Sequence, residues 1–127
     1  MPLTAPAIDY PRLDRLHGGS RGQIVSVLHL FLDEVMPDFD QLEAGMAQQN
    51  WVGVADVAHK IVPWVGMVGL TSLEMELRQL EQYAKSAPEP EGVISRWNHF
   101  KAGLEQALPV LRSELDRLAD PTSPTIP

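Results

Sequence analysis

Hydrophobic residues recur every three or four positions over most of the chain, a spacing typical of amphipathic helices. No alternating run is long enough to require a strand. Four long helices bury their apolar faces most simply as an antiparallel four-helix bundle, so the pattern predicts an all-α fold. The four apolar faces are, in order, Ile24, Val27, Leu28, Phe31, Val35, Phe39, Leu42 and Met46; Val54, Val57, Ala58, Ile61, Val65 and Val68; Leu73, Leu77, Leu80 and Ala84; and Val93, Trp97, Phe100, Leu104, Leu108, Leu111, Leu115 and Leu118.

A short additional helix is expected before these four. Asp9 can cap its first turn, Pro11 suits the first helical positions, and the glycine pair at 18–19 ends it. The chain before it, residues 1–8, is rich in proline, and residues 119–127 are as well. We therefore expect two flexible ends around one bundle domain of residues 9–118.

Polar residues with the spacing of capping boxes mark the starts of two long helices. Ser20 is followed three positions later by Gln23, and Thr71 in the same way by Glu74. Asn50 can cap the helix that lies between them, and this helix should run from about Trp51 to about Val68, where Gly69 ends it.

Three of the long predicted helices contain a proline, at positions 37, 63 and 109. Pro37 removes one backbone hydrogen bond and should bend the first long helix near Asp33, while Pro109 should kink the last helix. The polar, proline-containing segment 86–92 is expected to connect the third long helix to the last.

Composition narrows the class of protein. The 127 residues fit one domain, and 10 Lys and Arg against 17 Asp and Glu leave a net charge of -7. Nucleic-acid-binding and anionic-membrane-binding proteins select for basic surfaces, so both classes are disfavoured. The chain has no cysteine, and no apolar run approaches the roughly 20 residues that span a bilayer. The amino terminus lacks the features of a signal peptide, so we expect a cytoplasmic protein.

His59 is the strongest candidate for chemistry. At about 100° per residue it points about 140° away from the apolar face of its helix, so its imidazole should be exposed. Its neighbours on that side, Ala55, Val62, Pro63 and Gly66, are compact and would leave it accessible to a large partner. Together with Met67 they are the expected partner-docking surface. Trp64 could extend this surface or pack at the edge of the core.

The residues around His59 resemble the signature of histidine-containing phosphotransfer (HPt) domains. The resemblance covers roughly residues 8–118 and is specific around the histidine. Its elements are Ala58 directly before His59, Ile61 two after it, Gly69 ten after it and Leu73 fourteen after it, with Asp9-Tyr10, Phe31-Leu32 and Asn50-Trp51 as the similar lead-in.

Two positions depart from that family pattern. Val62 stands where HPt domains usually have a lysine that neutralises phosphoryl charge, and Pro63 stands where they usually have glycine. Lys60 could replace the lysine in part, although it lies about 100° round the helix from His59.

The resemblance implies a phosphocarrier that is not an ATP-binding enzyme. His59 would accept a phosphoryl group from a receiver-domain aspartate and pass it to another receiver, with Glu81 holding the imidazole and Lys85 lying near the phosphate. Neutral imidazole is a suitable nucleophile near pH 7. No cofactor is expected on this chain, because the receiver brings the Mg²⁺. Receiver domains and a hybrid sensor histidine kinase are the implied partners, and a monomer is the implied state.

Other chemistries have weaker support. No His-x-x-x-His or Glu-x-x-His spacing is present, so no metal site is expected. Two function hypotheses remain open at the level of sequence. The chain is either an active histidine phosphocarrier or an HPt-like bundle that transfers no phosphate and acts as a docking or inhibitory module. Val62 and Pro63 are the residues that separate them.

Overall fold

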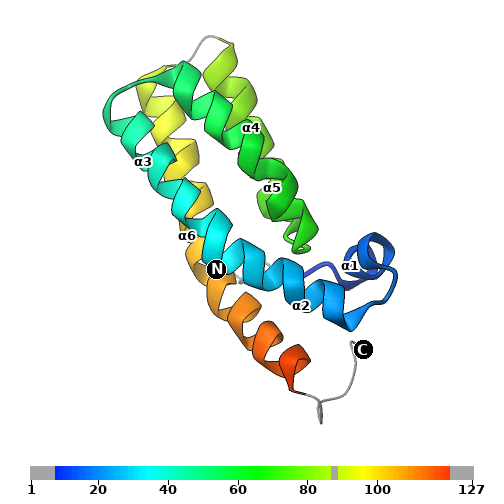
Figure 1. Cartoon of the computed structure of the whole chain (residues 1–127). Helices are drawn as coiled ribbons and strands as arrows, with labels where there is room; N and C mark the ends of the chain where they lie inside the picture. Colours follow the sequence, from blue (N-terminus) through cyan, green and yellow to red (C-terminus); the bar gives the residue numbers. More distant parts are fainter. Residues whose placement is uncertain (1–7, 87–88, 121–127) are drawn as a thin grey trace, which may run out of the picture.

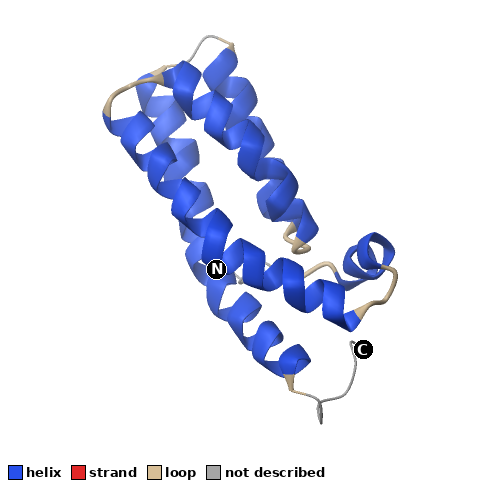
Figure 2. Cartoon of the chain, in the orientation of Figure 1, coloured by secondary structure: helices blue, strands red, loops and turns tan. Residues whose placement is uncertain are grey.

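The chain folds into a bundle of helices (Figures 1 and 2). The computed structural model describes residues 8–86 and 89–120, and no strand occurs in them. The all-α prediction and the short leading helix are therefore confirmed. The elements are α1 (Tyr10–His17), α2 (Arg21–Leu30), the π-helical η1 (Phe31–Val35), the 3₁₀-helical η2 (Met36–Asp38), α3 (Phe39–Ala47), α4 (Trp51–Met67), α5 (Thr71–Lys85) and α6 (Pro90–Ala119).

The first long helix changes its winding instead of remaining a single α-helix. It passes from α2 through one wide turn, η1, and one tight turn, η2, into α3. The predicted bend site, Asp33, lies in the wide turn, and Pro37 lies in the tight one. Because proline has no N–H to donate to the preceding turn, the hydrogen-bonding pattern shifts there. The change keeps Phe31, Leu32 and Val35 buried.

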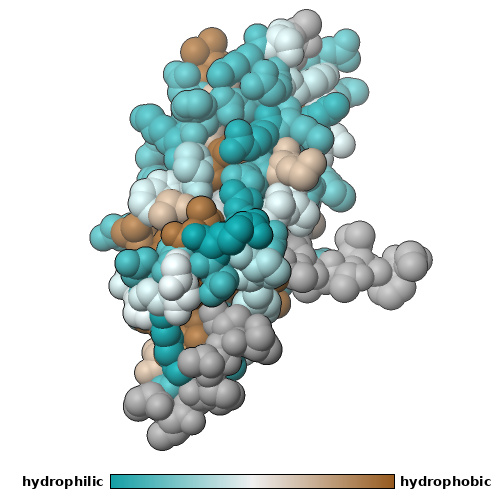
Figure 3. Space-filling model, turned by 90° about the vertical axis from the view of Figure 1, so that its right-hand side faces the viewer, coloured by the Kyte–Doolittle hydropathy of each residue, from teal (hydrophilic) through white to brown (hydrophobic). Residues whose placement is uncertain are grey.

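The helices pack around one apolar core. α4 packs against α3 and α5, while α6 packs against α5 and α2. Stacked rings fill the part of the core between α3 and α6: the ring of Phe39 lies 6.5 Å from that of Trp97 and 5.9 Å from that of Phe100. Hydrophilic residues cover most of the face shown in Figure 3, with small hydrophobic patches close together across its middle.

Helix α1 is tied to the start of α5, and this corrects the second predicted capping box. Thr71 is the first helical residue and follows Leu70 at the N-cap position. Its hydroxyl donates to the Asp9 carboxylate at 3.1 Å. The Arg12 guanidinium binds both carboxylate oxygens of Glu74, at 2.7 and 3.0 Å. The box does not form because both of its side chains are bound by α1 and its N-cap residue.

The ends of the domain also differ from expectation. Ile8 is buried, and the Asp9 N–H donates to the Gly69 carbonyl at 2.8 Å, so packing begins before residue 9. Ala119 still belongs to α6. The last helix starts at Pro90, inside the segment expected to be a connection, because proline is well suited to a first helical turn. Residues 1–7, 87–88 and 121–127 lie outside the described residues.

Candidate functional site

His59 lies on α4 and contacts Glu81 of α5. The helices α4 and α5 run side by side (Figure 1). The side chain of His59 is 74% exposed, as the helical wheel predicts. The Nδ1 atom lies 2.9 Å from Oε2 of Glu81, whose side chain is only 7% exposed. One edge of the imidazole is thus fixed by a buried group while the rest of the ring stands in solvent.

The pairing of α4 with α5 brings these two residues together. The two helices are antiparallel and joined by a tight turn in which Gly69 has a φ of 80°, a conformation that favours glycine. Seven residues after His59, Gly66 faces Glu74, which is seven residues before Glu81: a Cβ on Gly66 would lie 2.3 Å from Oε2 of Glu74. A single register therefore holds from the turn up to His59.

The Glu81 carboxylate is also bound by Lys85. The Lys85 ammonium donates to the same Oε2 at 2.8 Å, so His59 and Lys85 share one oxygen. Burial by itself raises the pKa of Glu81. The hydrogen bonds from Lys85 and His59 outweigh it and hold the pKa below its usual value. Glu81 is consequently a carboxylate at neutral pH and can only accept hydrogen bonds.

This charge state determines which imidazole nitrogen is available. Since the Glu81 carboxylate has no proton to donate, Nδ1 of His59 must carry the hydrogen that joins the two groups. In the neutral imidazole, Nε2 then keeps its lone pair and stands on the exposed side of the ring. The arrangement presents a nucleophilic nitrogen to a partner in solvent.

The predicted docking surface needs correction. Ala55, Val62 and Gly66 are buried, because α5 covers the side of α4 that they share with His59. Pro63 is exposed and Met67 is half-buried. Only these last two of the five residues can reach a partner.

Gly66 has a different role from the one expected. A Cβ at this position would lie 2.6 Å from a guanidinium nitrogen of Arg12 and even closer to Glu74. The absence of a side chain therefore makes room for the ion pair that ties α1 to α5. Arg12 itself was missed at the level of sequence, because nothing near α1 marks it as a partner of a residue 62 positions away.

The two basic residues predicted near the phosphate, Lys60 and Lys85, differ in their position relative to His59. Lys85 lies beside the imidazole through the carboxylate they share. Lys60 is exposed and stands about 100° round α4 from His59, away from α5.

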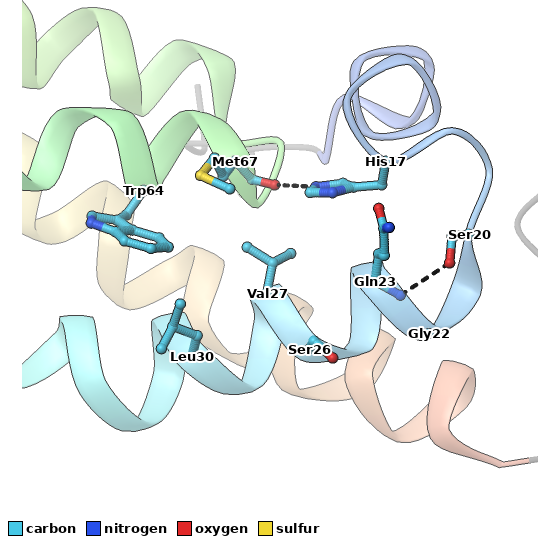
Figure 4. A pocket seen from close by; sticks show the side chains of 9 residues that line it. All are labelled: His17, Ser20, Gly22, Gln23, Ser26, Val27, Leu30, Trp64 and Met67. Carbon is cyan, nitrogen blue, oxygen red and sulfur yellow. Dashed lines mark hydrogen bonds between the residues drawn. The ribbon is translucent and has the colours of Figure 1, made fainter.

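An open groove of about 570 Å³ lies on the far side of α4 from α5 (Figure 4). Trp64 and Met67 of α4 face Val27 and Leu30 of α2 across it. Its end is closed by His17 of α1, which bonds the Met67 carbonyl at 3.1 Å through Nε2. Trp64 both packs against the core and lines this groove, so the two expectations for it are compatible.

Within residues 8–86 and 89–120, no three histidine or acidic side chains are grouped so that they could hold a metal ion. No helix in this part of the chain is both long and apolar enough to cross a membrane.

Comparison with known proteins identifies the family. The chain has no significant match among curated proteins or among solved structures. Residues 26–120, which include His59, Glu81 and Lys85, match the family model described as the Hpt domain. This match covers most of the chain and agrees with its helical fold and its exposed histidine. The chain belongs to the Hpt domain family.

Proposed function

We propose that this protein is a histidine phosphocarrier in which His59 accepts a phosphoryl group from a receiver-domain aspartate and passes it to a second receiver. Hpt domains act in phosphorelays as phosphocarriers and interact with receiver domains of response regulators. One observation carries the assignment to His59: its Nδ1 is held by the Glu81 carboxylate at 2.9 Å while the side chain is 74% exposed.

The proposed step moves no proton. The Nε2 lone pair of neutral His59 attacks the phosphorus of the aspartyl phosphate, the N–P bond forms, and the P–O bond to the receiver's carboxylate breaks. The ring becomes a cation that keeps its hydrogen on Nδ1, next to the negative charge of Glu81. This pairing stabilises the phosphorylated ring. The reverse step returns the phosphoryl group to another aspartate by the same route.

The groove beside α4 is the proposed docking site for the receiver. A standard protein interface covers about 800 Å² on each partner, which is a patch roughly 30 Å across. Met67 follows His59 by eight residues, or about 12 Å along the helix. A receiver placed over His59 therefore also reaches Pro63 and the apolar groove lined by Trp64 and Met67.

Phosphoryl transfer from a receiver tests the proposal. The intact protein is incubated with purified receiver domains of its own organism, each phosphorylated beforehand, and acid-labile label on this chain is measured. We expect label on the wild type and none on His59→Gln. The matched control is His99→Gln, which changes another exposed histidine, 69% exposed, and should keep the label.

The alternative is a bundle that binds signalling proteins without transferring phosphate. One observation favours it: the position at which the family usually has lysine is occupied by Val62, which is apolar and buried. A wild type that binds receivers yet acquires no label from any of them would establish this alternative and overturn the phosphocarrier.

A further inference from the structure

We infer that Arg78 of α5 is the residue that binds the phosphoryl group on His59, in place of the positive charge that α4 lacks at Val62. The inference rests on the proposed function and adds to it a residue that the sequence pattern does not indicate. Three observations carry it: the register of α4 against α5, the balance of charge along their shared face, and the contacts of Arg78.

The register places Arg78 at the level of Val62. His59 faces Glu81, and Gly66 faces Glu74, so a step forward along α4 matches a step back along α5. Three residues after His59 is Val62, and three residues before Glu81 is Arg78. The axial offset from His59 is about 4.5 Å. Lys85 lies at a similar offset on the opposite side, so two cations of α5 bracket the imidazole.

Arg78 also points to the correct side of its helix. At about 100° per residue, Glu74, Arg78, Glu81 and Lys85 fall within about 60° of one another around α5. Contacts confirm this shared face: Arg78 reaches Glu74, and Lys85 reaches Glu81. Since Glu81 contacts His59, the whole row lies along the edge of α5 that borders α4.

Counting Arg12, three cations contact the two carboxylates of this row, so Arg78 is one positive charge in excess. Arg12 binds both oxygens of Glu74, at 2.7 and 3.0 Å, and Lys85 binds Glu81 at 2.8 Å. Each carboxylate is thus already matched by one positive charge. A phosphoryl group on His59 would bring additional negative charge close to the buried Glu81, and Arg78 is the remaining charge in the row that can offset it.

The contacts of Arg78 leave its guanidinium able to turn toward His59. The side chain is 61% exposed, and its bond to Glu74 is long, at 3.4 Å. That carboxylate stays doubly bonded to Arg12 if Arg78 leaves it. An arginine can donate two parallel hydrogen bonds to phosphoryl oxygens. Rotation toward His59 exchanges one long ionic contact for hydrogen bonds to the phosphoryl oxygens.

The test uses phosphoramidate, a small donor that needs no receiver. The Nε2 lone pair attacks phosphorus, the N–P bond to His59 forms, and the P–N bond to ammonia breaks, while Arg78 forms hydrogen bonds only. The intact wild type, Arg78→Gln, Arg78→Lys and Arg112→Gln are compared by labelling rate and by ³¹P NMR titration of the phosphoryl group. Arg112 is an exposed arginine of α6 and serves as the matched control.

We expect Arg78→Gln to be labelled about fivefold more slowly, as one charge about 4 Å away in water predicts. Its phosphoryl pKa should also rise, because a lost cation disfavours the dianion. Arg78→Lys should restore most of both effects, and Arg112→Gln should match the wild type. A purely structural role of Arg78 would leave the phosphoryl pKa unchanged. The inference is overturned if Arg78→Gln and Arg112→Gln behave alike.

A second variant guards against a folding defect. In Val62→Lys combined with Arg78→Gln, the new lysine can extend along the surface from a mostly buried stem and return the charge to α4. Recovery of the labelling rate supports the charge exchange, and a folded double variant that stays slow contradicts it. The outcome is separable from the proposed function, which fails only if phosphorylated receivers do not label His59.

Discussion

At the scale of single residues, one carboxylate determines the chemistry of His59. Glu81 is buried and keeps its charge because Lys85 and His59 donate to it, so it holds the hydrogen of the imidazole on Nδ1. The positions of both polar partners follow from the family resemblance, whereas the 2.9 Å contact is a property of the folded pair of helices.

Replacing Glu81 by alanine should change the tautomer of His59. With the carboxylate present, we expect the neutral ring to carry its hydrogen on Nδ1; in Glu81→Ala the Nε2–H form should become the major one. Because Nε2 is the proposed attacking atom, labelling by phosphoramidate should fall about tenfold, comparable to the loss of an orienting partner at a metal ligand. Long-range ¹⁵N–¹H NMR spectra at pH 8 measure the tautomer.

His99 provides an internal control in the same spectra. Its Nε2 lies 2.9 Å from Oε1 of Glu76 without forming a hydrogen bond to it, so the tautomer of His99 does not depend on Glu81. The His99 signals should not move in Glu81→Ala. A His59 tautomer that is the same in Glu81→Ala as in the wild type would contradict the role assigned to Glu81.

At the scale of elements, α1 is held to the bundle by polar contacts at both of its ends. Asp9 bonds Thr71 and the Gly69 backbone at one end, and His17 bonds the Met67 carbonyl at the other. The Arg12–Glu74 pair lies between them. Since α1 closes one end of the groove, these contacts also fix the shape of the proposed docking site.

The Arg12–Glu74 pair should make stability depend on pH. The hydrogen bond from Arg12 outweighs burial and holds the pKa of Glu74 below its usual 4.5. A carboxyl with a lowered pKa contributes stability above its unfolded pKa and loses it as pH falls through the folded pKa. Glu74→Gln should therefore be less stable than the wild type by about 1–3 kcal/mol at pH 7. The difference should shrink below pH 4.5.

Urea unfolding at pH 7 and pH 3 measures this dependence. Glu34→Gln, which removes an exposed carboxylate from η1, is the matched control and should be nearly neutral at both values. A Glu74→Gln variant whose deficit is the same at pH 3 as at pH 7 would show that packing, and not charge, accounts for the loss.

At the scale of the whole molecule, α4 carries the two proposed sites on two of its sides. The side toward α5 holds His59 against the row of ionic residues, and the far side lines the apolar groove with α1 and α2 (Figure 4). A receiver that contacts both would be positioned by the groove and would react at the histidine.

A charge placed in the groove should weaken docking without touching the chemistry. Ser26 is exposed and lines the groove, so Ser26→Glu should fold normally and disfavour an apolar partner surface. We expect transfer from a phosphorylated receiver to fall about tenfold through weaker binding, while labelling by phosphoramidate is unchanged. Ser95→Glu, at an exposed site on α6, is the control. Equal transfer by the two variants would rule out the groove as the docking site.

Much of the fold could be predicted from the amino-acid sequence. Apolar spacing, the caps at Asp9, Ser20 and Asn50, and the glycine that ends α4 are local signals, and each predicted a helix boundary that the structure confirms. Local signals fail where a distant segment competes for the same side chain. Thr71 and Glu74 have the spacing of a capping box, yet Thr71 bonds Asp9 at the N-cap of α1 and Glu74 binds Arg12.

The exposure of His59 was determined by the sequence, because a residue about 140° from an apolar face must leave the core. The tertiary structure alone decided which of its neighbours are exposed. Ala55, Val62 and Gly66 share its side of α4, but α5 packs over them and leaves the imidazole at the border between the two helices. The register of that packing, which depends on contacts across the turn at Gly69, is what places Glu81 on the ring and Arg78 one turn away.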